Sequence, residues 1–200
     1  MKKSGREEIL YQHGYEEFSH EGYDNASINS IIEKSGISKG SFYYRFSGKE
    51  DFYLFLAKMA FNEKLRILRD LVSKNGTSGD IFDIIKVQAR ALVEYAFSDR
   101  VMYNFSRSFY KEKGKEIYKK VLSLHNGNMD AMLVEMVSAA YEKGKLRNDL
   151  PVDFIVKAFL HYFSTLPDLL DMFGNIDDKE KLLQYCLFFI ETLKNGLGKK

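Results

Sequence analysis

Apolar residues recur every three or four positions along most of this 200-residue chain, a spacing typical of amphipathic α-helices. The pattern predicts a first helix over about residues 5–20 and a second helix that Asn25 or Ser27 caps. Ser38 is expected to cap a third helix, and a long fourth helix should run over about residues 49–73. The first third of the chain is therefore predicted to hold three helices followed by a longer one.

The rest of the chain keeps this helical spacing but is interrupted by groups of turn-forming residues. These interruptions predict helices over about 81–97, 99–110, 116–142 with a break at 125–128, 151–173 and 178–195. Pro167 is expected to kink or interrupt the helix over 151–173, because proline lacks the backbone N–H. With only two prolines in the chain, the pattern predicts an all-α fold of about nine helices in total.

Composition and charge narrow the class of protein only in part. With 45% hydrophobic and 29% charged residues, the chain has an ordinary globular composition and can bury a sizeable core. The net charge of +2 does not predict nucleic-acid binding, and residues 1–50 carry seven cations against eight acids. Lys39, Arg45 and Lys49, however, lie between residues 35 and 49 without any acid, so positive charge is concentrated in one short segment.

Several classes of chemistry are not expected. The four histidines show no metal-ligand spacing with one another or with the single cysteine, Cys186. The chain also has no glycine-rich phosphate loop, nucleophile elbow or paired-carboxylate motif. We therefore expect no enzyme activity, no catalytic residue, no metal and no cofactor. Cys186 is interpreted as a small buried hydrophobe, with a redox sensor as the alternative.

Targeting and membrane segments are not expected either. No uninterrupted apolar run approaches the ~20 residues of a membrane-spanning helix. The basic N-terminus is followed by acids rather than by the apolar core of a signal peptide. The sequence therefore predicts a cytoplasmic protein without a membrane partner.

The segment over residues 35–46, Ser-Gly-Ile-Ser-Lys-Gly-Ser-Phe-Tyr-Tyr-Arg-Phe, is typical of the second half of a DNA-binding helix-turn-helix. Gly36 supplies the tight turn, and Phe42 and Phe46 face inward at a spacing of four residues. Small residues at the start of the helix allow a close approach to base edges, while tyrosines and cations suit sugar, base and phosphate contacts. The alternative is an ordinary helical corner with half-buried tyrosines.

The flanking sequence favours the first interpretation, because it adds a set of further motifs. These are Ile9-Leu10, Phe18, Glu21-Gly22-Tyr23-Asp24, Ser27-Ile28, Ile31, the run from Gly36 to Tyr44, Phe46 and Lys49-Glu50. Over about residues 6–56 the set resembles the N-terminal domain of TetR-family (tetracycline-repressor-like) transcriptional regulators. The resemblance implies an all-helical homodimer, with a three-helix DNA-binding domain over 1–48 and a larger helical ligand-binding and dimerisation domain over 49–200.

The resemblance also implies which residues contact DNA. Ser27 would contact phosphate, and the third helix would lie at the major groove. Three departures from the family pattern matter. Arg45 replaces the commoner histidine and adds a cation, and Ala26 replaces the usual threonine and removes one cap or phosphate contact. Gly48 replaces a usual serine or asparagine cap before the fourth helix. The implied DNA-binding residues are Ser27, Ser38, Lys39, Gly40, Ser41, Tyr43, Tyr44, Arg45 and Lys49.

The two C-terminal helices are apolar on nearly every face, so each must be buried on both sides. Two such helices cannot both be central to the core of one 200-residue subunit, whereas a four-helix bundle across a two-fold axis buries both. The resemblance points to the same pair of helices. The expected interface residues are Phe159, Phe163, Leu166, Leu170, Tyr185, Phe188 and Phe189.

The middle of the chain is rich in Phe, Tyr and Met, which favours either an apolar ligand pocket or plain helical core. Taken singly, these residues fit core better, but the resemblance implies that some pocket binds a small molecule. The candidate pocket residues are Tyr103, Phe105, Phe109, Tyr110, Met132, Met136, Phe159, His161, Tyr162 and Phe163.

These features together predict a one-component, ligand-responsive transcriptional repressor. Its partners would be a palindromic double-stranded DNA operator, a second copy of the chain, and a small hydrophobic or aromatic effector that releases the DNA. Two alternatives remain: a helical carrier of hydrophobic small molecules, and a DNA-binding protein with a solid core that responds to no inducer.

Overall fold

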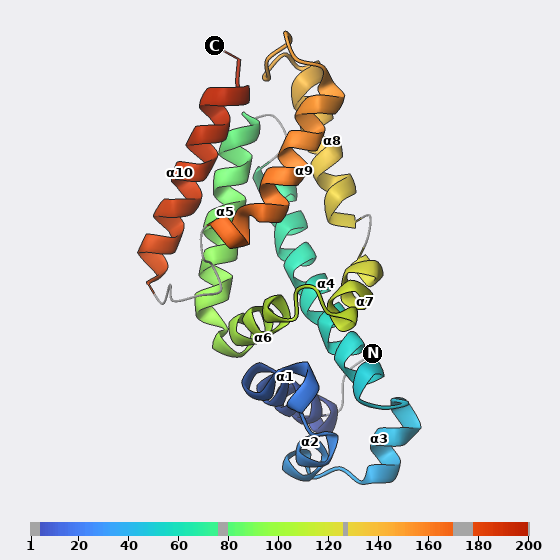
Figure 1. Ribbon diagram of the computed structural model, residues 1–200. Coiled ribbons are helices and arrows are strands. Elements are labelled where there is room, and N and C mark those ends of the chain that lie inside the picture. Colours follow the sequence, from blue (N-terminus) through green and yellow to red (C-terminus); the bar gives the residue numbers. More distant parts are fainter. Residues whose placement is uncertain (1–4, 76–79, 126–127, 170–177, 200) are drawn as a thin grey trace. The chain divides into compact units, whose positions relative to one another are not determined.

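The computed structural model describes residues 5–75, 80–125, 128–169 and 178–199, and the helices in these ranges are shown in Figure 1. The predicted all-α class is confirmed. The described ranges hold ten helices, because the break near residue 126 separates two of them. They are α1 (Gly5–Asn25), α2 (Ile28–Ser35), α3 (Lys39–Arg45), α4 (Lys49–Asn75), α5 (Ile81–Ser98), α6 (Arg100–Lys111), α7 (Glu116–His125), α8 (Asn128–Glu142), α9 (Val152–Leu169) and α10 (Lys179–Leu197).

The chain forms two compact units, neither of which is continuous in sequence. The N-terminal unit combines residues 1–63 with residues 99–125, and the C-terminal unit combines residues 64–98 with residues 126–200. The predicted division at residue 48 therefore does not coincide with the boundary between the units. Helices α6 and α7 belong with the helix-turn-helix because α6 packs along α1.

Aromatic side chains from α1, α3 and α4 form the core of the N-terminal unit. Phe18, Phe42 and Phe52 are fully buried, and their rings lie 5.3–6.3 Å apart where they meet. Helices α1 and α4 approach closely at Gly14, where a Cβ atom would lie 2.7 Å from both Phe52 Cε1 and Leu56 Cδ1. The short third helix is thus held by a core that α1 and α4 build.

Gly22 interrupts the helical conformation near the end of α1. Its φ of 72° lies in the left-handed region, which glycine adopts without strain. The first helix was predicted to end near residue 20, and its regular conformation is broken at Gly22, although helical turns resume as far as Asn25. The next residue, Tyr23, donates its backbone N–H to the buried Glu112 carboxylate at 3.1 Å.

The C-terminal unit packs α10 against α5, and α8 against α9 (Figure 1). Its core includes the fully buried Phe82, Ile155 and Phe159. Cys186 is also buried, and this burial raises the pKa of its thiol to about 11. A thiol that stays protonated at neutral pH fits the predicted role of a small buried hydrophobe.

Helix α9 contains Pro167 and continues to Leu169. The helix is therefore not interrupted at Pro167 itself, and the alternative expectation, a kink at this proline, stays a prediction. The predicted end of the helix, near residue 173, lies outside the described residues, as does the predicted interface residue Leu170.

Candidate nucleic-acid interface

Helices α2 and α3 form a helix-turn-helix, and the residues that cap and end these helices are those predicted from the sequence. The Ser27 hydroxyl accepts a hydrogen bond from the Ser30 backbone N–H at 3.3 Å and so caps α2. Gly36 ends α2 with a φ of 65°. The Ser38 hydroxyl then caps α3 by accepting from the Ser41 backbone N–H at 3.1 Å. Both predicted caps and the predicted glycine turn are confirmed.

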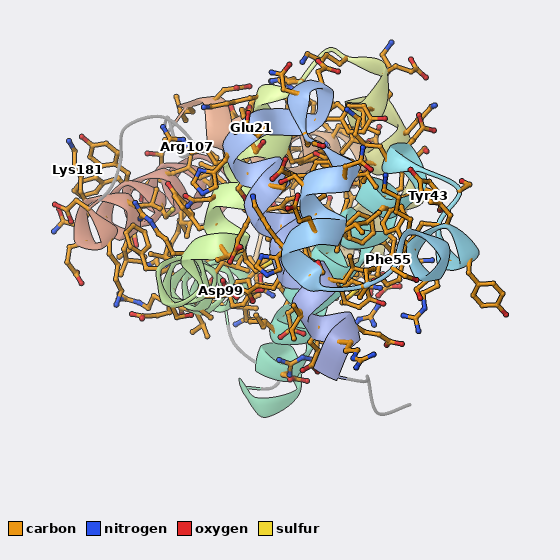
Figure 2. All side chains as sticks on the ribbon, turned by 90° about the horizontal axis from the view of Figure 1, so that it is seen from below. Glu21, Tyr43, Phe55, Asp99, Arg107 and Lys181 are labelled. Atoms are coloured by element: carbon orange, nitrogen blue, oxygen red, sulfur yellow. The ribbon has the colours of Figure 1, made fainter. Side chains whose placement is uncertain are left out.

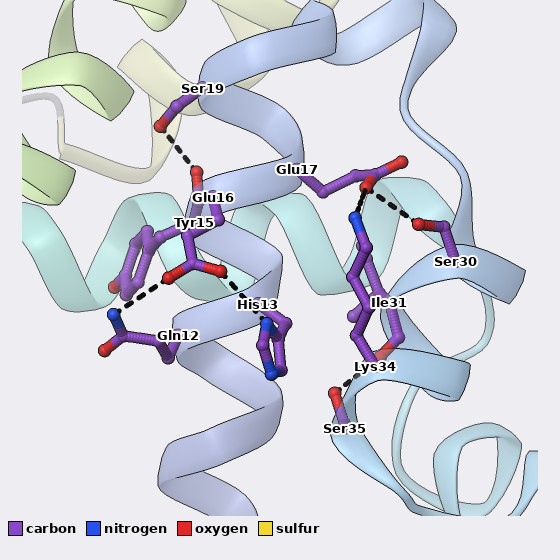
Figure 3. Close-up of polar contacts among 10 residues, drawn as sticks. All are labelled: Gln12, His13, Tyr15, Glu16, Glu17, Ser19, Ser30, Ile31, Lys34 and Ser35. Atoms are coloured by element: carbon purple, nitrogen blue, oxygen red, sulfur yellow. Dashed lines mark hydrogen bonds and ion pairs between the residues drawn. The ribbon is translucent and has the colours of Figure 1, made fainter.

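A buried carboxylate, that of Glu17, fixes the angle at which α2 leaves α1 (Figure 3). It accepts hydrogen bonds from the Ser27 backbone N–H at 3.0 Å and the Ser30 hydroxyl at 2.9 Å, and it pairs with Lys34 at 3.0 Å. Burial opposes the charge on Glu17, but these three contacts outweigh burial and hold its pKa below the ordinary value. The sequence analysis missed this residue, although an acid between Gly14 and Phe18 on the inner face of the first helix was an available signal.

Glu17→Gln should lower the free energy of unfolding by about 1–3 kcal/mol, because an amide cannot satisfy three donors that a carboxylate satisfies. The pKa of Glu17 is lowered from 4.5 in the folded state, so its contribution is present above that pH and is lost as the pH falls through the lowered value. Urea unfolding of both proteins across the acidic range measures this. The difference between them should shrink below pH 4.5. Glu33→Gln, which changes an exposed glutamate on α2, is the control and should have little effect at any pH.

The outer face of α3 takes no part in the packing of the unit. Phe42 and Phe46 point inward with 0% and 6% exposure, whereas Tyr43 (Figure 2) and Tyr44 are 54% and 91% exposed. A Cβ atom at Gly40 would meet only the Ser38 hydroxyl, at 3.8 Å, so internal packing does not demand a glycine there. The small residue and the two tyrosines are therefore free to serve an external partner.

The cations of this segment differ in what they already contact. Lys39 is exposed at the first position of α3. Arg45 forms an ion pair with Glu7 of α1. Lys49 donates to the backbone carbonyls of Asp24 at 2.7 Å and Ala26 at 3.2 Å, where it closes the end of α1. A change at Lys49 would disturb the fold as well as any phosphate contact, which makes Lys39 the cleaner probe of phosphate binding.

A groove of about 570 Å³ runs between α9 and α10 on the C-terminal unit. Large apolar side chains are exposed along it, and Phe188 is the most prominent of those on α10, with 64% exposure. We call this surface the α9–α10 groove. It is lined by Phe154, Ala158, Tyr162, Leu169, Tyr185, Phe188, Phe189, Thr192, Leu193, Gly196 and Leu197.

The predicted interface residues divide into an exposed and a buried set. Tyr185 and Phe188 line the groove with exposed side chains. Phe189 also lines it but is only 9% exposed, while Phe163 and Leu166 are half-buried against the core. Phe159 is fully buried inside the unit, and its expected contact with a second subunit stays a prediction. The sequence pattern could not separate these positions, because every face of α9 carries apolar residues.

The predicted pocket residues belong to two different units. Phe105 packs in the core of the N-terminal unit, 5.0 Å from the Tyr15 ring, and Phe109 stacks on Tyr118 in the same unit. Tyr103 is buried and Tyr110 is half-buried on the same helix. In the C-terminal unit, Met132 and Met136 are half-buried, Phe159 and Phe163 lie in or against the core, and His161 and Tyr162 are exposed. The aromatic richness of α6 therefore reflects core packing in a unit separate from that of α9.

The described residues also bear on metal binding and on membrane insertion. Among the described residues, no group of three or more His, Cys, Asp or Glu side chains is placed to hold a metal ion. Within the same ranges, no helix is long and apolar enough to cross a membrane.

Comparison with known proteins places this geometry in context. Residues 8–55 match the family described as bacterial regulatory proteins, tetR family. The HTH-type transcriptional repressor AcnR of Corynebacterium glutamicum is 24% identical over 138 residues, which cover 69% of this chain and 67% of AcnR.

Solved structures share the fold over nearly the whole chain. A putative TetR-family transcriptional regulator from Mesorhizobium loti has a TM-score of 0.73 at 16% identity, with 100% of both chains covered. The fatty acid degradation regulator FadR from Bacillus halodurans has a TM-score of 0.70 at 16% identity, and the match covers 92% of this chain and 97% of FadR. The similarity therefore extends beyond the helix-turn-helix to the helices that follow it.

Proposed function

We propose that this chain, whose residues 8–55 match the tetR family of bacterial regulatory proteins, acts as a one-component repressor that binds a palindromic operator as a homodimer. The observation that carries the proposal is the outer face of α3. Its Tyr44 side chain is 91% exposed, while the inward Phe42 and Phe46 hold the helix in place. A large aromatic residue that the fold does not use is suited to a contact outside the chain.

In this proposal α3 is the recognition helix. Gly40 lets the backbone approach the major groove, and Tyr43 and Tyr44 contact sugar, bases or thymine methyl groups. Lys39 and the amides at the start of α3 contact phosphates, with the capping hydroxyl of Ser38 and the neighbouring hydroxyl of Ser41 beside them. Ser27 contacts a neighbouring phosphate at the start of α2. On binding DNA, Arg45 exchanges its Glu7 partner for a phosphate, and Lys49 uses its remaining N–H.

The α9–α10 groove is proposed as the dimerisation surface. Its exposed Phe154, Tyr162, Leu169, Tyr185 and Phe188 side chains form an apolar patch on two adjacent helices, which pack as a four-helix bundle with the same helices of a second copy. Two copies then present two α3 helices to successive major grooves, roughly 34–36 Å apart.

The effector is proposed to be a small hydrophobic molecule that binds in the C-terminal unit and lowers the affinity for DNA. The similar structure named as a regulator of fatty acid degradation is consistent with an apolar effector. Met132, Met136 and Phe163, which are half-buried beside the core of α8 and α9, are the candidate lining. Coupling is reciprocal, so the operator must weaken effector binding by the same factor, typically worth about 1–3 kcal/mol.

The DNA-binding role is tested with Tyr44→Ala on an operator selected from random duplex DNA by the unaltered protein. Loss of one aromatic contact per subunit, each worth roughly 1–2 kcal/mol, should weaken binding by about 30-fold or more. Thermal stability should stay the same, because Tyr44 is almost fully exposed. Fluorescence anisotropy of labelled operator measures the affinity.

Leu122→Ala is the matched control, since it truncates an exposed apolar side chain on α7 of the same unit. It should leave the DNA affinity unchanged. The proposal fails if no duplex sequence is enriched by the unaltered protein, or if Tyr44→Ala binds the selected operator as tightly as the unaltered protein does.

A further inference from the structure

A second cavity, of about 490 Å³, lies within the N-terminal unit, and it is polar rather than apolar. The end of α1 forms one wall and α6 with the turn after it forms the other. We call it the α1–α6 cavity. Its lining residues are Ser19, His20, Glu21, Gly22, Asn104, Arg107, Ser108, Lys111, Glu112 and Lys115. The volume is within the range of small-molecule sites.

The cations of this cavity outnumber its acids, and two of them are not neutralised from within the unit. Lys115 is committed to Glu112 at 2.6 Å and to Asp24 at 2.7 Å. Arg107 and Lys111, by contrast, form no ion pair with any residue that the structure describes. Figure 2 shows Arg107 and the exposed Glu21, an acid of the opposite wall, next to each other.

Arg107 is the strongest indication that this cavity binds a ligand. Its Nε atom is buried, yet it has no hydrogen-bond partner among the described residues. An N–H donor that is removed from water without an acceptor is costly, and such a group in a folded protein calls for an explanation. Guanidinium groups are suited to carboxylates and phosphates, which they bind through paired hydrogen bonds.

The cavity walls do not supply the missing acceptor. The last carbonyls of α6 are already engaged, because Glu112 N–H donates to the Phe109 carbonyl and Lys113 N–H donates to the Tyr110 carbonyl, both at 3.1 Å. Ser108 donates its hydroxyl to the Phe18 carbonyl at 2.7 Å, and the Glu112 carboxylate accepts from Tyr23 N–H on its other side. Glu112 is already paired with Lys115, so Glu21 is the acid of the cavity wall that would compete with an anion entering from solvent. Such an anion would still meet the donors of Arg107 and Lys111, which form no ion pair with any described residue.

From this geometry we propose that the α1–α6 cavity binds a small anion with carboxylate or phosphate groups. Arg107 and Lys111 pair with the anionic groups, and Asn104 and His20 offer further polar contacts. The site is distinct from the apolar effector region proposed for the C-terminal unit. It also does not depend on the proposed function, because anion binding is measured in the absence of DNA.

Calorimetric titration of the full chain with inorganic phosphate, and separately with malonate, tests the site at constant ionic strength in sodium chloride. The unaltered protein should bind one anion per subunit with a Kd on the order of 1 mM or below. Arg107→Gln should weaken binding at least about 10-fold. Lys111→Gln should also weaken it, and because Lys111 is exposed this variant keeps the test valid if Arg107→Gln does not fold.

One further variant should change the affinity in the opposite direction, and two others serve as controls. Glu21→Gln removes an acid from the cavity wall and should strengthen binding by about 2- to 5-fold. Glu8→Gln makes the same change on the exposed surface near the other end of α1, and Lys113→Gln removes an exposed lysine that does not line the cavity. Both should stay within about 2-fold of the unaltered protein.

The proposal is tested by comparing anion binding among these variants. Saturable binding that is lost in Arg107→Gln and Lys111→Gln, but kept in Lys113→Gln, supports the site. Absence of saturable binding to either anion overturns it. So does an equal loss in Lys111→Gln and Lys113→Gln, which would indicate a general response to surface charge.

Discussion

Phe188→Asp should convert the proposed homodimer into a monomer. Phe188 is the most exposed large side chain contributed by α10, and it lines the α9–α10 groove. The substitution removes two phenylalanines from the interface, one per subunit, at roughly 2–3 kcal/mol each. It also places two carboxylates in a surface that must lose its water on association. A loss of about 4–6 kcal/mol corresponds to a dimer dissociation constant roughly 10³- to 10⁴-fold higher.

Sedimentation equilibrium measures this shift directly. The same variant should bind the selected operator far more weakly, because a monomer presents one recognition helix instead of two. Phe188→Leu keeps an apolar side chain and should remain dimeric. Leu122→Asp places the same charge on an exposed apolar position of α7, in the N-terminal unit, and should also leave the dimer intact.

A dimer that persists in Phe188→Asp would contradict the proposed interface. The monomeric subunit itself should keep its helical content in circular dichroism, since the side chain contributes little to the subunit core. This distinction matters because a misfolded variant would also lose the dimer.

Gly14→Val should destabilise the N-terminal unit more than any surface change in it. A Cβ atom at this position would lie 2.7 Å from Phe52 Cε1 and Leu56 Cδ1, and both neighbours are fully buried. Because these side chains have no free space to move into, α1 and α4 would have to separate. We expect a loss of about 3 kcal/mol or more, which is a large part of the usual stability of a domain.

Thermal unfolding should report a fall in Tm of about 6–12 °C for a chain of this size. Gly5→Val makes the same change in the same helix, where a Cβ atom has nothing within 4 Å, and should change Tm little. Operator binding should fall along with stability in Gly14→Val, because α3 is held by Phe42 against this core. An unchanged Tm would contradict this prediction, because it would show that α1 and α4 can separate at Gly14 without a loss of stability.

The local features of the helix-turn-helix could be predicted from the sequence because each depends on neighbours in the chain. Ser27 and Ser38 cap the helices that follow them, and Gly36 adopts the left-handed turn between them. Phe42 and Phe46 were assigned to the core from a spacing of four residues, and both are buried.

The features that the sequence did not reveal depend on residues far apart in the chain. Glu17 is satisfied by donors 10, 13 and 17 positions away, which no local pattern encodes. Lys49 was expected at DNA, but its ammonium reaches back to the carbonyls at the end of α1. Phe159 and Phe188 both lie in apolar helices, and only the packing shows that the first is core while the second is surface.

The discontinuity of the two units has a consequence for the order of folding during synthesis. Helices α1 to α4 leave the ribosome first, yet the wall that α6 provides against α1 is encoded after α5, which belongs to the other unit. The buried Glu112, which holds the turn at Tyr23, follows later still. The DNA-binding half therefore cannot complete its core until about residue 125 has been made, and by then the other half has already begun. A fragment cut after the helix-turn-helix would lack this wall, so its core would stay incomplete.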